Sequence, residues 1–151
     1  MRPLGRLLAG LLVVFANHVY ADDPRPKGTW QIIDADFSDI GHCLMTQTLE
    51  ITLKLGERRD GKDGTYIESF SREGDSGGCP SLGFYRILYD VKLTPALRSK
   101  SEYVATLTFN DCQQRGGQTC GIVEPVSYKR LVLDKSRNGA VFDGIFLDRI
   151  E

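Results

Sequence analysis

Ser76 and His42 are the residues best suited to chemistry, because a serine becomes a nucleophile when a histidine takes its proton. Ser76 lies in the string Gly-Asp-Ser-Gly-Gly-Cys-Pro at positions 74–80, and His42 directly precedes Cys43. A catalytic pair would require the fold to bring the two side chains within hydrogen-bonding distance. The sequence therefore raises one enzymatic hypothesis, a small hydrolase that uses Ser76.

The string around Ser76 resembles the Gly-Asp-Ser-Gly-Gly-Pro segment around the nucleophile of trypsin-like serine proteases, and Gly41-His42-Cys43 resembles the His-Cys pair of that family. In that family the His and the Ser belong to two separate barrels, and this chain has about half the necessary length. Cys79 also interrupts the Gly-Gly-Pro sequence, so the backbone that builds an oxyanion hole is not assured. We therefore expect a glycine-rich surface loop before a disulfide, and we do not expect an enzyme.

Acidic side chains gather at Asp34, Asp36 and Asp39, shortly before His42. A hard cation such as Ca²⁺ requires about six to eight oxygen ligands, and these residues match neither the EF-hand spacing nor its closing glutamate. Zinc is also disfavoured, because the cysteines form no C-x-x-C pair. We expect a solvated acidic turn after the first strand, with no metal and no cofactor.

The N-terminus has the three-part layout of a secretory signal. Arg2 and Arg6 supply positive charge, Leu7–Phe15 form an apolar run, and Val19-Tyr20-Ala21 form a small-residue cleavage site. The apolar run is shorter than the ~20 residues that a helix needs to cross a bilayer, so we expect a secreted or periplasmic protein without a membrane span. The predicted segments are a signal peptide (1–21), a loose leader (22–27) and a single β domain (28–151).

All four cysteines lie after the predicted signal, where an oxidising compartment favours disulfides over free thiols. Four cysteines allow three pairings, and the sequence alone does not choose among them. We favour Cys112–Cys120, because the short polar loop between them contains glycines and can bring its ends together; Cys43–Cys79 then follows. A closed loop loses less entropy on binding than a free one, so this loop is the candidate recognition site. Its candidate contact residues are Gln113, Gln114, Arg115, Gly116, Gly117 and Gln118.

Strand patterns dominate the chain after residue 28. In Thr48–Leu55 apolar residues alternate with polar ones, a period of two that is typical of a half-buried strand. A sustained helical stripe is missing, and Thr94–Lys100 is expected to hold at most one short helical turn. Seven or eight strands joined by short turns predict an all-β, antiparallel meander, closed into a barrel or folded into a sandwich and stapled by disulfides. The expected strands are Thr29–Ile33, Thr48–Leu55, Thr65–Phe70, Tyr85–Leu93, Tyr103–Phe109, Val126–Leu133 and Val141–Ile150.

Glycine-containing dipeptides mark the expected turns. Asp60-Gly61 and Asp63-Gly64 fall between the second and third expected strands, and Asn138-Gly139 falls between the last two. A type I′ turn needs positive φ at both central residues, which Asn and Gly tolerate best. Asn138-Gly139 is therefore the strongest hairpin prediction, and the mixed-charge segment Glu57–Gly64 is expected to form a solvated hairpin tip.

The first expected strand opens with Gly28-Thr29-Trp30. Here the chain resembles the lipocalin or calycin group, whose barrels begin with Gly-x-Trp and place that Trp at the closed end. The aromatic neighbours common in that group are missing, since Gln31 follows Trp30. The resemblance implies an eight-stranded up-and-down barrel that binds a small apolar ligand or a protein partner, without catalysis.

Composition and charge narrow the class of function. The chain of 151 residues is 41% hydrophobic and 26% charged, as one globular domain is, and its 19 basic against 20 acidic residues leave no excess charge for nucleic acid. We expect an exported, non-catalytic binding protein whose loops or barrel cavity meet a small apolar ligand or an extracytoplasmic protein, such as an enzyme that it would inhibit. The alternative is an envelope or secretion-associated assembly protein, in which an edge strand such as Thr65–Phe70 joins a partner's sheet.

Overall fold

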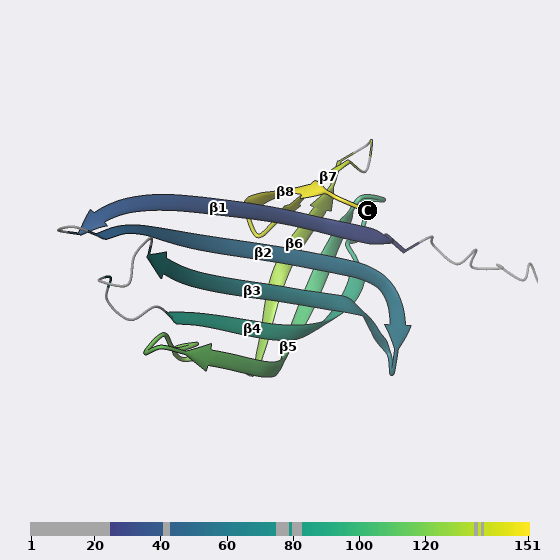
Figure 1. The fold of residues 1–151 in the computed structure, drawn as a ribbon. Helices are drawn as coiled ribbons and strands as arrows, with labels where there is room; N and C mark the ends of the chain where they lie inside the picture. The colour runs from purple at the N-terminus through teal and green to yellow at the C-terminus, as the bar shows by residue number, and fades with distance from the viewer. Residues whose placement is uncertain (1–24, 41–42, 75–78, 80–82, 135, 137) are drawn as a thin grey trace, which may run out of the picture.

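Eight antiparallel strands follow one another in chain order and close into a barrel (Figure 1). The structure, a computed structural model, describes residues 25–40, 43–74, 79, 83–134, 136 and 138–151, and these residues contain no helix. The predicted all-β meander is therefore confirmed, as a barrel and not a sandwich. The strands are β1 (Gly28–Ile40), β2 (Cys43–Arg59), β3 (Lys62–Gly74), β4 (Gly83–Pro95), β5 (Glu102–Arg115), β6 (Val126–Leu133), β7 (Gly139–Phe142) and β8 (Ile145–Arg149).

The period-two alternation places one face of each strand inside the barrel. In β2, Ile51, Leu53 and Leu55 are buried, whereas Lys54 between them is exposed. Full burial of one such side chain contributes ~1.5–3 kcal/mol, so the shared core is the main source of stability. Its members from the other strands are Trp30, Tyr66, Val91, Leu93, Tyr103, Ala105, Leu107, Leu131, Leu133, Ala140, Phe142 and Leu147.

Trp30 seals one end of the barrel, which we call the closed end. Its side chain is 1% exposed, and the guanidinium of Arg149 lies over its ring, 5.7 Å from the centroid. Arg149 also donates hydrogen bonds to the carbonyl oxygens of Glu151, at 2.8 Å, and of Lys27, at 3.3 Å. These contacts join the two ends of the domain where β1 meets β8. The arrangement is consistent with the lipocalin-like barrel that Gly28-Thr29-Trp30 implied.

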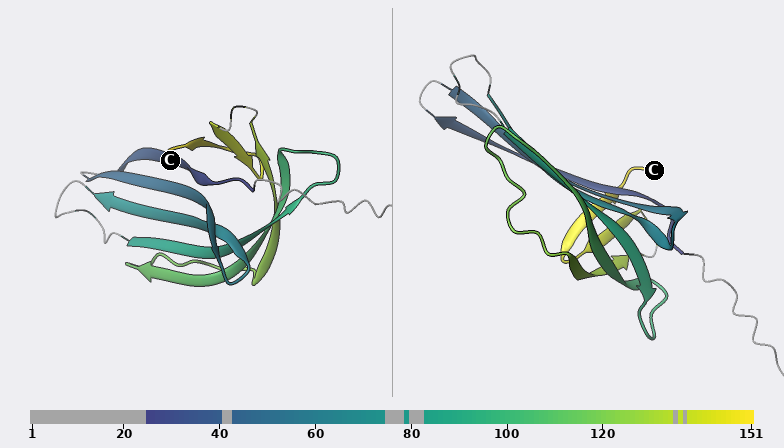
Figure 2. Two further views of the ribbon diagram at one scale, coloured as in Figure 1. Left: turned by 90° about the vertical axis from the view of Figure 1, so that its right-hand side faces the viewer. Right: turned by 90° about the horizontal axis from the view of Figure 1, so that it is seen from below.

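Unequal strand lengths leave part of the sheet outside the barrel. Strands β1–β5 have 13 to 17 residues, whereas β6–β8 have 4 to 8. Among the described residues, β8 pairs with β1 through Trp30 and Gln31 alone, and β6 pairs with β5 no further than Thr108. The long strands therefore continue past the barrel as an open five-stranded sheet (Figures 1 and 2). We call this sheet the overhang; it comprises residues 32–40, 43–51, 68–74, 83–87 and 112–115.

Two expectations about the sheet edges are wrong. Asp34, Asp36 and Asp39 do not form a turn after a short first strand, because the pairing of β1 with β2 continues without interruption to Ile40. The segment Thr65–Phe70 is not an edge strand either, since it pairs with β2 on one side and with β4 on the other. The two edges of the overhang are β1 on one side and, past Thr108, β5 on the other.

The turn between β2 and β3 is as predicted only in part. Asp60 and Gly61 have φ angles of 53° and 77° and form the expected turn. Asp63-Gly64 lies inside β3 instead, and the Asp63 side chain is buried, so the segment is not a fully solvated tip. Asp63 accepts the backbone N–H of Leu93 at 2.8 Å. The segment Thr94–Lys100 likewise holds a turn and not a helix.

The predicted hairpin between Val126–Leu133 and the next strand is present as β6 and β7, and a second, unpredicted hairpin, β7–β8, follows it. The expected strand Val141–Ile150 is two strands, joined at Asp143-Gly144, whose φ angles are 50° and 87°. Asn138-Gly139 does not form a type I′ turn, because Gly139 is the first residue of β7. A Cβ atom at Gly139 would meet the ring of Phe146 at 2.6 Å. Gly139 therefore allows Phe146 to pack closely against the backbone and does not reverse the chain.

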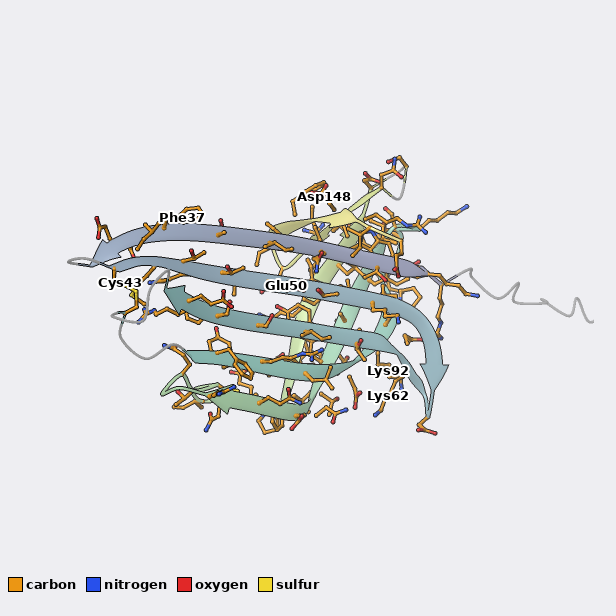
Figure 3. All side chains as sticks on the ribbon, in the orientation of Figure 1. Phe37, Cys43, Glu50, Lys62, Lys92 and Asp148 are labelled. Carbon is orange, nitrogen blue, oxygen red and sulfur yellow. A yellow bond between two sulfur atoms is a disulfide. The ribbon has the colours of Figure 1, made fainter. Side chains whose placement is uncertain are left out.

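Both predicted disulfides are confirmed. Cys43 pairs with Cys79 and Cys112 with Cys120, with Cα–Cα distances of 5.3 and 6.4 Å. They belong to the overhang side of the molecule, where Figure 3 labels Cys43. Two disulfides indicate an oxidising, extracytoplasmic environment. Across the described ranges no helix is long and apolar enough to span a membrane.

Candidate ligand-binding site

The barrel is filled at its closed end and hollow where the overhang begins. This hollow, which we call the mouth, has a volume of about 540 Å³, within the ~300–1,000 Å³ typical of small-molecule sites. Its apolar lining comprises Leu49, Ile51, Tyr66, Tyr89, Leu107, Ile122, Phe142 and Ile145. Its polar lining comprises Glu68, Glu124, Ser127, Lys129 and Asp143.

Glu68 projects from β3 toward the barrel interior between two pairs of aromatic rings. The register pairs Tyr66 with Tyr89 and Phe70 with Tyr85, one pair on each side of Glu68 along the same face. The ring centroids are 5.8 Å apart in the first pair and 5.7 Å apart in the second. We call these four rings the aromatic frame. The Tyr85 hydroxyl donates a hydrogen bond to Oε1 of Glu68 at 3.2 Å.

The electrostatic environment keeps the phenols of the frame protonated. Burial is the main cause that raises the pKa of Tyr66, and the negative charge of Glu68 raises it further. Burial and Glu68 likewise raise the pKa of Tyr85 and of Tyr89, and Glu124 adds to the effect at Tyr89. These tyrosines therefore act as neutral hydrogen-bond donors and apolar walls.

Lys129 is held on the opposite side of the mouth by an ion pair. Its ammonium lies 2.6 Å from Oδ2 of Asp143, which begins the turn after β7. The hydrogen bond to Asp143 raises the pKa of Lys129. Since Asp143 balances Lys129, the remaining charge of the lining is that of Glu68 and Glu124. Within the described segments no Lys or Arg forms an ion pair with Glu68.

A bulge in β5 turns the second disulfide toward the interior. The register between β4 and β5 shifts between Leu88 and Tyr89 and leaves Asn110 without an opposite residue. Cys112 therefore lies opposite Ile87, whose side chain is buried on the inner face. The disulfide to Cys120 consequently fastens the chain that follows β5 on the mouth side.

The predicted recognition loop does not line the mouth itself. Gln113–Arg115 end β5, and Gly116–Gln118 follow as a turn in which the Gln118 N–H donates to the Arg115 carbonyl at 3.4 Å. The chain beyond the disulfide returns toward the barrel, and Ile122 and Glu124 reach the mouth. The stapled loop is thus connected to the site through its continuation, and its own side chains lie outside.

A second hollow lies on the outer face of the overhang. It is a more open trough of about 660 Å³ along β3. Glu50, labelled in Figure 3, lies on one wall, where its carboxylate accepts hydrogen bonds from Gln31 at 2.7 Å and from Thr52 at 3.2 Å. The trough is more open than the mouth and is lined mainly by polar and charged residues, so the mouth is the more enclosed candidate site. Side chains on this outer face come from Thr48, Glu50, Ser69, Ser71, Glu73, Phe84, Arg86 and Arg115.

The remaining candidates for chemistry do not form a site in the described structure. Ser76 and His42 lie outside the described residues. Asp34 and Asp36 are exposed on β1. No group of three or more His, Cys, Asp or Glu side chains that could hold a metal ion occurs in the part of the chain that the structure describes.

Sequence reasoning missed the residues that line the mouth. Tyr66, Glu68 and Tyr89 come from two strands, and Lys129 and Asp143 from two later segments, so the pattern of a single strand does not reveal them. One signal was present: Glu68 occupies an inward position in the alternation Tyr66, Glu68, Phe70, where an apolar residue is expected. A carboxylate at such a position points to a site.

Comparison with known protein families, with curated proteins and with solved structures finds no match to this chain.

Proposed function

We propose that the protein is an exported, non-catalytic binding protein that holds a small amphipathic molecule in the mouth of its barrel. The observation that carries the proposal is the mouth, a hollow of about 540 Å³ with an apolar floor and a few charged groups at its sides. Sites for small molecules have this composition, because the apolar surface supplies affinity and the polar groups supply orientation.

Three further features support a binding role outside the cytoplasm. The signal-like layout of residues 1–21 and the two disulfides favour a secreted or periplasmic location. The closed end is sealed by Trp30 and Arg149, so a ligand enters from the overhang side. Gly28-Thr29-Trp30 and the up-and-down barrel together favour a place in the lipocalin or calycin group.

Native mass spectrometry of the protein purified from its own compartment tests this function. Extra mass of a few hundred daltons that disappears on denaturation is the expected result. Leu49→Trp should abolish the extra mass, because the indole would occupy the mouth. Thr48→Trp is the matched control, since Thr48 belongs to the outer trough and not to the mouth. Wild-type protein without bound mass would contradict the proposal and redirect the search to protein targets of Gln113–Gln118.

The free edge of β1 favours a second candidate function, assembly with another protein by strand addition. Thr29 donates its N–H to the Glu151 carbonyl and accepts the N–H of Ile150, just after β8. The alternate residues Ile33, Ala35, Phe37 and Asp39 therefore direct their backbone groups to the same side. Beyond Gln31, no described strand pairs with that side. Ile33 and Phe37 are 58% and 65% exposed on this edge, where Figure 3 labels Phe37. An unpaired edge of this kind accepts an additional strand.

Ala35→Pro separates the two candidate functions. Proline lacks the N–H group that a joining strand would use, so the variant should lose co-purifying protein partners and retain any ligand in the mouth. Size-exclusion chromatography with light scattering measures the first effect, and native mass spectrometry measures the second. Unchanged association in Ala35→Pro would remove the assembly function.

A further inference from the structure

Glu68 is a half-buried carboxylate whose partners are phenols and not cations. It accepts a hydrogen bond from the Tyr85 hydroxyl at 3.2 Å, and its negative charge raises the pKa of the nearby Tyr66. An ionised carboxylate offers about four acceptor sites, so this one donor leaves most of its capacity unused. A carboxylate withdrawn from water is most stable when a cation pairs with it. The mouth is open next to Glu68, so a ligand can supply that cation.

The other charges that face the mouth do not supply the cation. Strand β6 contributes Lys129, which is engaged with Asp143 at 2.6 Å. The segment before β6 contributes Glu124, a second carboxylate. The lining therefore has three acidic side chains and one basic side chain. An anionic head would be repelled by this arrangement, and a positive one would be attracted.

Aromatic rings surround the same carboxylate. Tyr66 and Tyr89 stand on one side of Glu68 along the strand, and Phe70 and Tyr85 stand on the other. The negative face of an aromatic ring attracts an ammonium group within about 6 Å of its centroid. Rings and a carboxylate together bind substituted ammonium groups well, because the alkyl substituents pack against the rings and the charge meets the carboxylate.

We propose that the ligand of the mouth is a cationic amphiphile, with an organic ammonium head held by Glu68 and by Tyr66 and Tyr89, the two rings of the aromatic frame that line the mouth. The apolar body lies on the floor formed by Leu49, Ile51, Leu107 and Phe142. This inference rests on the proposed function, because it names the chemical class of the molecule that the mouth binds. It predicts a preference for positive heads over neutral or negative heads on the same alkyl chain.

Isothermal titration of the disulfide-bonded protein with three probes of equal chain length tests the inference. The probes are decyltrimethylammonium, decanol and decanoate. Decyltrimethylammonium should bind at least about tenfold more tightly than decanol, since one carboxylate and the rings favour its head. Decanoate should bind most weakly of the three.

Two variants identify the groups responsible. Glu68→Gln keeps the shape of the side chain and an acceptor for Tyr85 but removes the charge. It should lower the affinity for decyltrimethylammonium about tenfold and leave the affinity for decanol unchanged. Tyr89→Leu keeps an apolar wall but removes a ring, and it should lower the affinity for decyltrimethylammonium more than the affinity for decanol. Glu73→Gln is the matched control, because Glu73 lies on β3 but lines the outer trough. It should change neither affinity.

The outcomes distinguish this inference from the proposed function. Equal affinity for decanol and decyltrimethylammonium in the wild type would overturn the ammonium site and leave the amphipathic ligand in place. Equal losses for both probes in Glu68→Gln would assign Glu68 a structural role and would also overturn the inference. Absence of binding by all three probes, together with a bare mass in native spectra, would overturn the proposed function as well.

Discussion

Asp63→Ala should lower the free energy of unfolding by about 3 kcal/mol, although Asp63 lies outside the candidate site. The Asp63 side chain is 6% exposed. Its carboxylate accepts the backbone N–H of Leu93 at 2.8 Å and pairs with the guanidinium of Arg25 at 2.6 Å. Alanine would remove both contacts and leave the Leu93 N–H without its acceptor.

The two contacts contribute unequally. The bond to Leu93 is buried, and a hydrogen bond to a charged group is worth ~1.5–3 kcal/mol. The Arg25 side chain is 41% exposed, so water screens the ion pair and its contribution is ~0–1 kcal/mol. Asp63→Asn should therefore cost about 1 kcal/mol, because the amide oxygen still accepts the Leu93 N–H. Arg25→Ala should cost less than about 1 kcal/mol.

Urea unfolding followed by the fluorescence of Trp30 measures all three variants, since Trp30 is the single tryptophan and is buried in the core. The expected order of stability is wild type, Arg25→Ala, Asp63→Asn, Asp63→Ala. Loss of less than about 0.5 kcal/mol in Asp63→Ala would refute the reasoning. An Arg25→Ala loss equal to that of Asp63→Ala would also refute it, because the exposed ion pair would then be the main contribution.

Three further predictions use the same unfolding assay. Replacing Cys112 and Cys120 together by serine should cost about 2.5 kcal/mol, because the disulfide closes a loop with a sequence separation of 8; a loss under about 1 kcal/mol would contradict this. The raised pKa of Tyr66 means that the folded protein holds the phenolic proton more tightly than the unfolded chain, so stability should fall as pH rises above 10.0. Tyr66→Phe should reduce that alkaline fall, and an unchanged pH profile would speak against it. Gly64→Ala should cost ~1–3 kcal/mol, since a Cβ would collide with the carbonyl of Lys54; wild-type stability would show that β2 moves freely.

The fold was predictable to the extent that burial imposes a pattern on single strands. Thr48–Leu55 and Tyr85–Leu93 alternate clearly because their inner residues form the barrel core, and the structure confirms them within β2 and β4. The overhang segment Asp34–Asp39 has no such pattern, because neither of its faces is covered by a core. Its strand structure comes from backbone pairing with β2, which polar side chains permit equally well.

The candidate site was less predictable, because it depends on register between segments far apart in the chain. The disulfide Cys112–Cys120 followed from a short spacing and a flexible loop. The approach of Tyr89 to Glu68 instead requires the alignment of β3 with β4, and the approach of Lys129 to Asp143 requires β6 and β7 to pair. These alignments follow from the closed sheet as a whole and leave little trace in local composition.

Because of the overhang, the backbone amides of the barrel and those of the open sheet should exchange with solvent by different opening reactions. Around Leu53 the strands enclose a hydrophobic core, so their amides exchange with solvent only when the whole domain unfolds. Around Gln47 the same strand lies outside the barrel core, and the buried side chain of Met45 and the disulfide at Cys43 restrain it instead. Local separation of the sheet can therefore expose its amides while the closed end stays intact. A ligand in the mouth would thus contact a rigid floor and a more flexible sheet around it. The boundary between slow and fast hydrogen exchange would lie within the single strand β2.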